Sequence, residues 1–295
     1  MSHIHVRKIL ESRINYAGRS WSYEFRSIPQ YCAEATVAKT CQQLLRKIAP
    51  IAKDWNDDRN SEWISRIYFA AKMILASSVM AQSLDFAKAK NLRAAIPYLD
   101  YYTVLNILRS LLLTSPHAPW NDGKLLFTTH TKTINVATDI IGQYDNKVAS
   151  RAKKHIIHLK AFRELISYRA PSSGDSFPRA DIDVIDLCRL FAEIAQLQSE
   201  LIEASILRSV TGKFSLKSQA IDRICKVNID GITFYDQEDH YRMDYLRRKY
   251  PLPTNILHIM SEGHVEDFFG SWCPKDEEED QFDPDGNWRI LFDVP

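Results

Sequence analysis

The feature that most constrains the fold of this chain is the spacing of its apolar residues, which recur at intervals of three and four over most of the first 212 positions. Residues at this spacing share one face of an α-helix, and that face must be buried against other elements. Proline and turn-forming residues divide the pattern into separate segments. Nine glycines in 295 residues are few for a fold rich in tight turns. The pattern therefore predicts an all-α helical bundle.

Each predicted helix combines an apolar stripe with residues that begin or end it. Pro50 closes the first pattern, and Pro97 either kinks the third or marks its first turn. Asn60 or Ser61 can cap the second helix, because their side chains can accept from free backbone amides. The turn-rich segment 170–178 is the clearest interior loop. The predicted helices cover residues 32–52, 61–89, 92–114 and 146–168, then 181 or 183 to 210, with a further helix-like series at 134–141.

The periodicity becomes short and broken after Gly212, which stands where a left-handed C-cap would end the preceding helix. Beyond it we expect helices near 216–227, at 238–249 and after Pro253, a strand at 231–235 and an apolar strand-like end. A weaker strand pattern lies at 125–131. The chain thus divides into an N-terminal helical extension (1–59), a helical bundle (60–212) and a smaller, mixed α+β C-terminal region with an acidic tail (213–295).

Composition excludes several classes of protein. The 38 Lys and Arg nearly balance the 37 Asp and Glu, and 45% of residues are hydrophobic, so the chain is neither a uniformly basic nucleic-acid coat nor disordered. The most apolar stretch, 104–113, is interrupted by polar residues, and no membrane span is expected. Without a secretory pattern at its N-terminus the chain is expected to be cytoplasmic. Its five scattered cysteines predict buried free thiols.

Common catalytic motifs are missing from the sequence. GxSxG, GxxxxGK[ST], GxGxxG and HExxH do not occur, so the hydrolase-elbow, P-loop, dinucleotide and zinc-peptidase interpretations lack their minimum pattern. The segment DPDGN at 283–287 fits a tight turn better than a calcium loop, because Phe292 stands where the bidentate Glu is needed. We therefore predict no metal site and no cofactor.

The overall charge balance hides two strongly charged segments. Acidic residues dominate the tail between Asp276 and Asp285. The second segment is a predicted helix between Arg151 and Arg169 that is rich in Lys and Arg. Such a helix is what a phosphate-rich ligand requires, although exposed charge is also the ordinary state of a helix surface. The tail could also dock on this helix and mask it. The predicted nucleic-acid-binding residues of the helix, beside Arg151 and Arg163, are Lys153, Lys154, His155, Lys160 and Arg169.

Two histidines add chemistry to the cationic helix. Arg151, His155 and His158 lie at i, i+4 and i+7 and share a helix face. A His that titrates near neutrality beside a constant cation is the minimum apparatus for RNA cleavage, since one group moves a proton and the other stabilises the phosphate charge. The alternative is a pair of surface histidines without a catalytic role.

Three consecutive segments carry a family resemblance. AAIPYLDYYTVLNILRSLLLTSP at 94–116, TTHTKTINVATDII at 128–141 and LKAFRELISYRAP at 159–171 together resemble the core of HEPN domains, over roughly residues 60–210. The resemblance implies an antiparallel helical bundle with a Tyr- and Leu-rich central helix. Active members of that family resemble metal-independent ribonucleases in which an Arg and a nearby His meet their copies across a homodimer.

Three placements of that Arg–His pair are open. Arg151 and His158 enclose six residues but lie early in their helix, whereas Arg163 fits the surrounding helix better and is followed after four residues by Tyr168. A Tyr in place of His resembles the non-cleaving branch that binds nucleotides or partners. A third, poorer placement is Arg109 with His117, which straddles Pro116.

We therefore expect an RNA- or nucleotide-directed role of the prokaryotic defence or toxin type. In a ribonuclease, Arg151 would stabilise charge and His158 would carry the proton, with Arg163 and Tyr168 lining the phosphate site. The alternative is a non-catalytic helical interaction or regulatory protein whose basic cluster binds an acidic protein partner. A crevice that holds Arg163 with His158 or His130 favours catalysis, whereas a packed and paired Arg163 favours a structural role.

Overall fold

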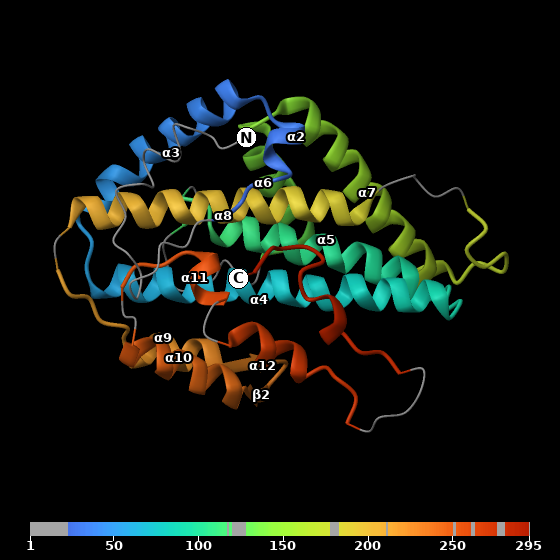
Figure 1. The fold of residues 1–295 in the computed structure, drawn as a ribbon. Helices are drawn as coiled ribbons and strands as arrows, with labels where there is room; N and C mark the ends of the chain where they lie inside the picture. The colour runs from blue at the N-terminus through green and yellow to red at the C-terminus, as the bar shows by residue number, and fades with distance from the viewer. Residues whose placement is uncertain are drawn as a thin grey trace.

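The computed structural model describes residues 23–116, 118–119, 128–177, 183–210, 212–249, 252–260, 263–275 and 281–294. It confirms an all-α helical bundle with a small mixed α+β region near the C-terminus. Long helices make up the bundle, and α4, α5 and α8 extend alongside one another in Figure 1. The bundle helices are α2 (Ile28–Tyr31), α3 (Glu34–Lys53), α4 (Asp57–Ala89), α5 (Ile96–Leu113), α6 (His130–Gly142), α7 (Asn146–Arg169) and α8 (Val184–Ser209).

Side-chain caps fix where several helices begin. The Asp145 carboxylate accepts from the amides of Lys147 and Val148, so α7 begins at residue 146 as predicted. Asp183, one of the two residues expected to begin α8, caps it by accepting from the Asp186 amide. The start of α4 differs from the prediction. Asn56 caps it instead of Asn60 or Ser61, which places one more turn in the helix.

Proline and glycine account for further differences. Pro97 lies in the first turn of α5, where its missing N–H costs no hydrogen bond. Pro50 does not close its helix, because α3 continues through it to Lys53. Gly212 does not form the expected left-handed C-cap, since α8 ends at Val210 in an extended conformation (φ −134°, ψ 135°). The strand pattern at 125–131 is wrong where it can be checked, because His130 and Thr131 are helical; residues 125–127 lie outside the described ranges.

The core lies along α5 and α8. Thirteen of the eighteen residues of α5 are buried, which confirms its predicted central position. α8 is buried continuously from Leu190 to Ile206 because α3, α5 and α11 (Ile256–Met260) all pack on it. Four of the five cysteines are buried free thiols, as predicted, and Cys273 is half-buried.

One described helix, α4, is long and apolar enough by composition to span a membrane. In the structure 61% of its apolar window is buried by the surrounding helices. This degree of burial is typical of a core helix.

The C-terminal region is built around one hairpin and short helices. The strands pair antiparallel, with Val227 opposite Phe234 and Ile229 opposite Ile232. Asp230 (φ 52°) and Gly231 (φ 84°) make the two-residue turn, a conformation that favours Asp-Gly. The apolar end is not a strand but a single 3₁₀ turn followed by irregular chain, so that expectation is wrong. These elements are α9 (Ser218–Cys225), β1 (Lys226–Ile229), β2 (Ile232–Tyr235), α10 (Gln237–Lys249), α11, α12 (His264–Gly270) and η2 (Asp285–Asn287).

The two ends of the described chain meet at the start of α8. The buried Glu193 carboxylate accepts from the backbone amides of Arg26, Ser27 and Ile28 at 2.8–2.9 Å and so caps α2 from another helix. The rings of Tyr23 and Phe292 pack with centroids 4.5 Å apart.

Candidate functional site

The cationic helix predicted from sequence is α7, and its charged residues differ widely in exposure. Tyr168 is 75% exposed, whereas Arg163 is only 9% exposed. Both positions lie in the second half of the helix. Arg151, Lys154 and Arg169 are exposed, and Lys153, His155, His158 and Lys160 are half-buried.

Helix geometry separates the predicted catalytic residues into two groups. Arg151, His155 and His158 share one face of α7, as the spacing predicts. Arg163 follows His158 by five residues, which turns it about 140° around the helix at about 100° per residue. Arg163 therefore points into the bundle, away from the face that carries Arg151 and His158.

Arg163 packs on two tyrosines of α5. Its guanidinium carbon lies 5.2 Å from the ring centroid of Tyr101 and 6.0 Å from that of Tyr102. Its Nη2 atom makes a long ion-pair contact of 3.4 Å with Glu164 Oε1. The Nε atom is buried and has no hydrogen-bond partner among the described residues.

His130 contacts the same tyrosines from α6. It is the first residue of that helix, which the Thr129 hydroxyl caps, and a helix N-terminus carries partial positive charge. Its Nδ1 atom lies 3.0 Å from the Tyr101 hydroxyl, and its ring meets that of Tyr102 edge-on at 6.0 Å. Arg163 and His130 are thus brought together by a shared pair of aromatic rings.

Arg109 completes the group, which we call the His130 cluster: Tyr101, Tyr102, Arg109, His130 and Arg163. Arg109 follows Tyr102 by seven residues on α5 and shares its face. Long helical side chains lean toward the helix N-terminus, here toward the tyrosines. Its charge acts on both tyrosines and on His130. Its Nε atom is also buried without a hydrogen-bond partner in the described part of the chain.

The electrostatics of the cluster favour a neutral imidazole and an incoming anion. Burial lowers the pKa of His130, and the charges of Arg109, Arg163 and Lys160 lower it further, so the ring is neutral at pH 7. Burial raises the pKa of Tyr101 to about 12, which keeps its hydroxyl protonated. Burial also lowers the pKa of Arg109, since no anion among the described residues compensates its partial desolvation. A bound phosphate would supply that compensation.

A neutral imidazole hydrogen-bonded through Nδ1 can act as a proton acceptor. When Nδ1–H donates to the Tyr101 oxygen, the Nε2 lone pair is free to take a proton from a substrate. Two nearby guanidinium groups can meanwhile bind and stabilise a phosphate. The arrangement therefore supplies phosphate binding and one general base.

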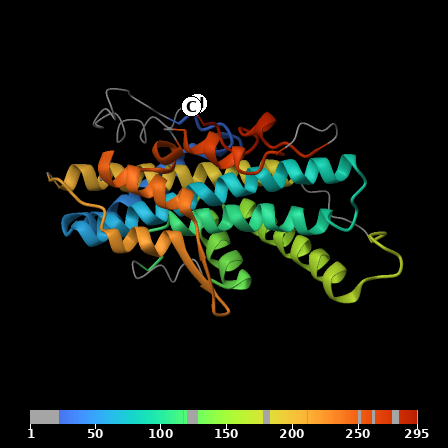
Figure 2. The same cartoon turned by 90° about the horizontal axis from the view of Figure 1, so that it is seen from below.

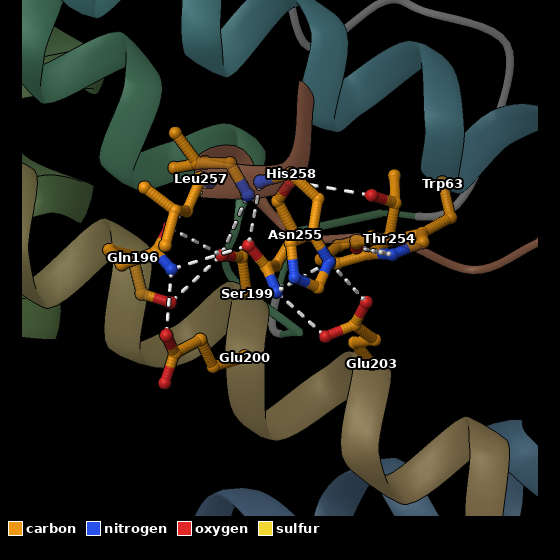
Figure 3. Close-up of polar contacts among 10 residues, drawn as sticks. Trp63, Gln196, Ser199, Glu200, Glu203, Thr254, Asn255, Leu257 and His258 are labelled. Carbon is orange, nitrogen blue, oxygen red and sulfur yellow. Dashed lines mark hydrogen bonds and ion pairs between the residues drawn. The ribbon is translucent and has the colours of Figure 1, made fainter. Parts of the chain in front are cut away.

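A second polar cluster joins α8 to the segment before α11, and Figure 3 shows it. The Asn255 amide donates to Glu203 at 2.7 Å, and His258 Nδ1 lies 3.1 Å from the same carboxylate. Gln196 accepts from the Leu257 amide at 3.0 Å. His258 and Glu203 are both buried, and their side chains contact each other between the two segments. This cluster is an internal anchor for the C-terminal region.

Sequence reasoning identified Arg163 and named His130 as a possible neighbour, but it missed the other members of the cluster. The two tyrosines were interpreted only as part of the Tyr- and Leu-rich central helix. Arg109 was considered only with His117, which lies outside the described residues. The signal that could have revealed Arg109 is its place seven residues after Tyr102, on the same face of a mostly apolar helix. The α8 anchor also went unnoticed, although Gln196, Glu200 and Glu203 recur at helical spacing.

No protein-family model, curated protein or solved structure matches this chain. The resemblance to HEPN domains therefore stays a prediction. Within the described ranges, no group of three or more His, Cys, Asp or Glu side chains is placed to hold a metal ion.

Proposed function

We propose that this protein binds a phosphodiester of RNA at the His130 cluster and cleaves it with His130 as the general base. The observation that carries the proposal is a neutral imidazole beside two guanidinium groups whose Nε atoms are buried and lack hydrogen-bond partners in the described part of the chain. Buried donors without partners are costly, and phosphate oxygens would satisfy them.

In the proposed reaction, phosphate oxygens accept from Arg109 and Arg163. His130 Nε2 takes the proton from the ribose 2′-hydroxyl, and the 2′ oxygen attacks phosphorus. The bond from phosphorus to the 5′ oxygen breaks, and that oxygen takes a proton from water. The guanidinium groups stabilise the additional negative charge on phosphorus-bound oxygens as the attack proceeds. The reaction requires the tautomer in which His130 Nδ1–H donates to the Tyr101 oxygen and the Nε2 lone pair is free.

RNA digestion in the presence of EDTA tests the cleavage. We expect His130→Ala and Arg163→Ala each to slow cleavage about 100-fold or more, as loss of a general base or of a charge-stabilising donor does. Lys147→Ala is the matched control, because it removes an exposed cation from the first turn of α7, outside the predicted nucleic-acid-binding residues. Equal cleavage by all four proteins would remove the ribonuclease proposal. Loss only in Arg151→Ala and His158→Ala would move the site to the exposed face of α7.

Phosphate binding is tested separately by proton NMR titration of His130. A bound nucleoside monophosphate places negative charge beside the imidazole, which raises its pKa. We expect uridine 3′-monophosphate to raise the pKa of His130 in the wild type and not in Arg163→Ala. An unchanged pKa at saturating nucleotide would contradict the site.

The same hypothesis includes a cytoplasmic role of the prokaryotic defence or toxin type. Four buried free thiols support a reducing compartment. Expression in a bacterium is expected to slow growth, and His130→Ala is expected to relieve the effect. Equal growth inhibition by both proteins would separate toxicity from the proposed reaction.

A second candidate function is the binding of an acidic protein partner by the exposed face of α7. Ile157 is 50% exposed and Tyr168 75% exposed, close to exposed cations on the same helix. Apolar and aromatic side chains among cations are typical of an interface. Polyglutamate and polyuridylate probes distinguish the functions: a preference for polyglutamate that Arg151→Glu removes would favour the partner. Oligomeric state bears only on the Arg151–His158 placement, because a site composed of two copies requires a homodimer, whereas the His130 cluster lies within one chain.

A further inference from the structure

A large groove runs between the bundle and the C-terminal hairpin. It has a volume of about 1390 Å³ and is lined by α4 and α5 on one side and by α9, the hairpin and the start of α10 on the other. Pockets for drug-sized molecules usually measure about 300–1,000 Å³, so this groove accommodates a longer ligand. Figure 2 shows the hairpin (orange) and α6 (green) projecting from the same side of the molecule.

One wall of the groove is apolar and partly aromatic. The strand register places Val227, Ile229 and Phe234 on one face of the hairpin, and all three line the groove. Phe234 is 52% exposed and Ile229 53% exposed, although they stand beside Phe69 and Met73 of the opposite wall. Exposed aromatic rings in a groove provide surfaces on which nucleic-acid bases can stack.

Cations lie on both sides of the apolar wall. Seven Lys and Arg line the groove against five Asp and Glu. Some are paired internally, as Lys217 is with Asp58 and Lys72 is with Asp239, both at 2.5 Å. Arg59 on α4 and Lys226 on β1, which also contacts the Asp222 carboxylate at 3.4 Å, add charge on opposite walls. The lining therefore combines stacking surfaces with an excess of positive charge.

Arg109 connects the groove to the His130 cluster. It lines the groove, and its charge acts on His130 and both tyrosines of the cluster. A chain of phosphates could thus pass from the cations of the groove to Arg109 without leaving a positively charged surface. An apolar peptide carries no phosphates and would gain nothing from a continuous row of cations.

We infer that the groove binds a single-stranded RNA segment and leads one of its phosphodiesters to the His130 cluster. The bases lie against Phe234 and Phe69, and the phosphates lie along Arg59, Lys226 and Arg109. The inference rests on the proposed function, because it assigns the single-stranded part of the substrate to a surface next to that site.

Fluorescence anisotropy with a labelled eight-nucleotide oligouridylate in EDTA tests the inference, with uridine 3′-monophosphate as a short competitor. His130→Ala is used as the background so that the RNA stays intact. We expect Phe234→Ala to weaken oligouridylate binding about tenfold, as loss of one stacked base does, and to leave mononucleotide binding unchanged. Lys226→Glu is expected to weaken oligomer binding and to reduce its dependence on salt.

Ile232→Ala is the matched control, because Ile232 is 60% exposed on the same hairpin and does not line the groove. Circular dichroism and thermal melting check that each variant folds. Unchanged oligomer binding in Phe234→Ala and Lys226→Glu, with binding still lost in Arg163→Ala, would overturn the groove and leave the proposed function standing. If Arg163→Ala still bound both the oligouridylate and the mononucleotide, the proposed function would be overturned instead. Displacement of RNA by an uncharged apolar peptide of equal length would identify the groove as a peptide site.

Discussion

The buried imidazole of His264 makes the stability of this protein depend on pH below neutrality. The residue is 4% exposed, and its ring stacks on that of Tyr68 with centroids 5.2 Å apart. Burial, together with the nearby charges of Arg242 and Lys72, lowers its pKa from 6.5 to about 3. Nδ1 has no hydrogen-bond partner within the described ranges.

The direction of the effect follows from proton binding. Below pH 6.5 the unfolded chain takes up a proton at His264 that the folded chain does not, so acid stabilises the unfolded state. Stability contributed by this residue is therefore complete above pH 6.5, falls as the pH falls, and levels off below about pH 3. At about 1.4 kcal/mol per pH unit, the loss is about 2 kcal/mol at pH 5 and only about 0.2 kcal/mol at pH 7.

Urea unfolding of the wild type and of His264→Phe at both pH values measures this loss. Phenylalanine keeps an aromatic ring on Tyr68 but cannot take up a proton. The difference in unfolding free energy between the two proteins should shift by about 2 kcal/mol in favour of the variant between pH 7 and pH 5. An unchanged difference would refute the reasoning, provided that the denaturant dependence of each protein stays the same.

Three further outcomes follow from buried contacts. Glu193→Ala removes the acceptor for three backbone amides and should lower the unfolding free energy by about 2–4 kcal/mol in urea titrations, whereas the exposed Glu24→Ala should have little effect. Asn255→Leu breaks the α8 anchor at its centre and should cost about 2–4 kcal/mol in the same assay; a near-neutral result would show that the anchor is dispensable. Iodoacetamide should label only Cys273 in the native protein, and mass spectrometry showing early labelling of Cys188 would contradict its burial.

The helices could be predicted because each carries a local signal that tertiary packing reinforces. The apolar period of α5 and the Asp145 and Asp183 caps are examples. Boundaries were less certain where two residues could do the same task. Asn56 and Asn60 are both able to cap α4, and only packing decides that Asn60 is buried inside the helix near Ser215. The prediction that Pro50 closes its helix was wrong because a proline near a helix end leaves the remaining turn intact.

The candidate site was only half visible in the sequence. Arg163 stood out within a cationic helix, but its neighbours come from two other helices, and 29 residues separate Tyr101 from His130. Helical spacing grouped His158 with Arg151, and the same spacing turns Arg163 away from both. Which side chains meet across a bundle depends on how helices pack, and one amino-acid sequence carries no direct record of that.

The meeting of the chain ends at α8 has a consequence for the order in which the protein assembles. Tyr23 and Asp293 are 270 residues apart and are joined by a hydrogen bond of 3.3 Å, while Arg189 Nε donates to the Ile290 carbonyl at 2.9 Å. During synthesis on the ribosome, the segment that begins at Tyr23 cannot form these contacts until residues 290–293 have been made. The first described residues are therefore among the last to reach their native places, and a chain that stops before residue 290 leaves Tyr23 without the Phe292 ring and Arg189 without the Ile290 carbonyl.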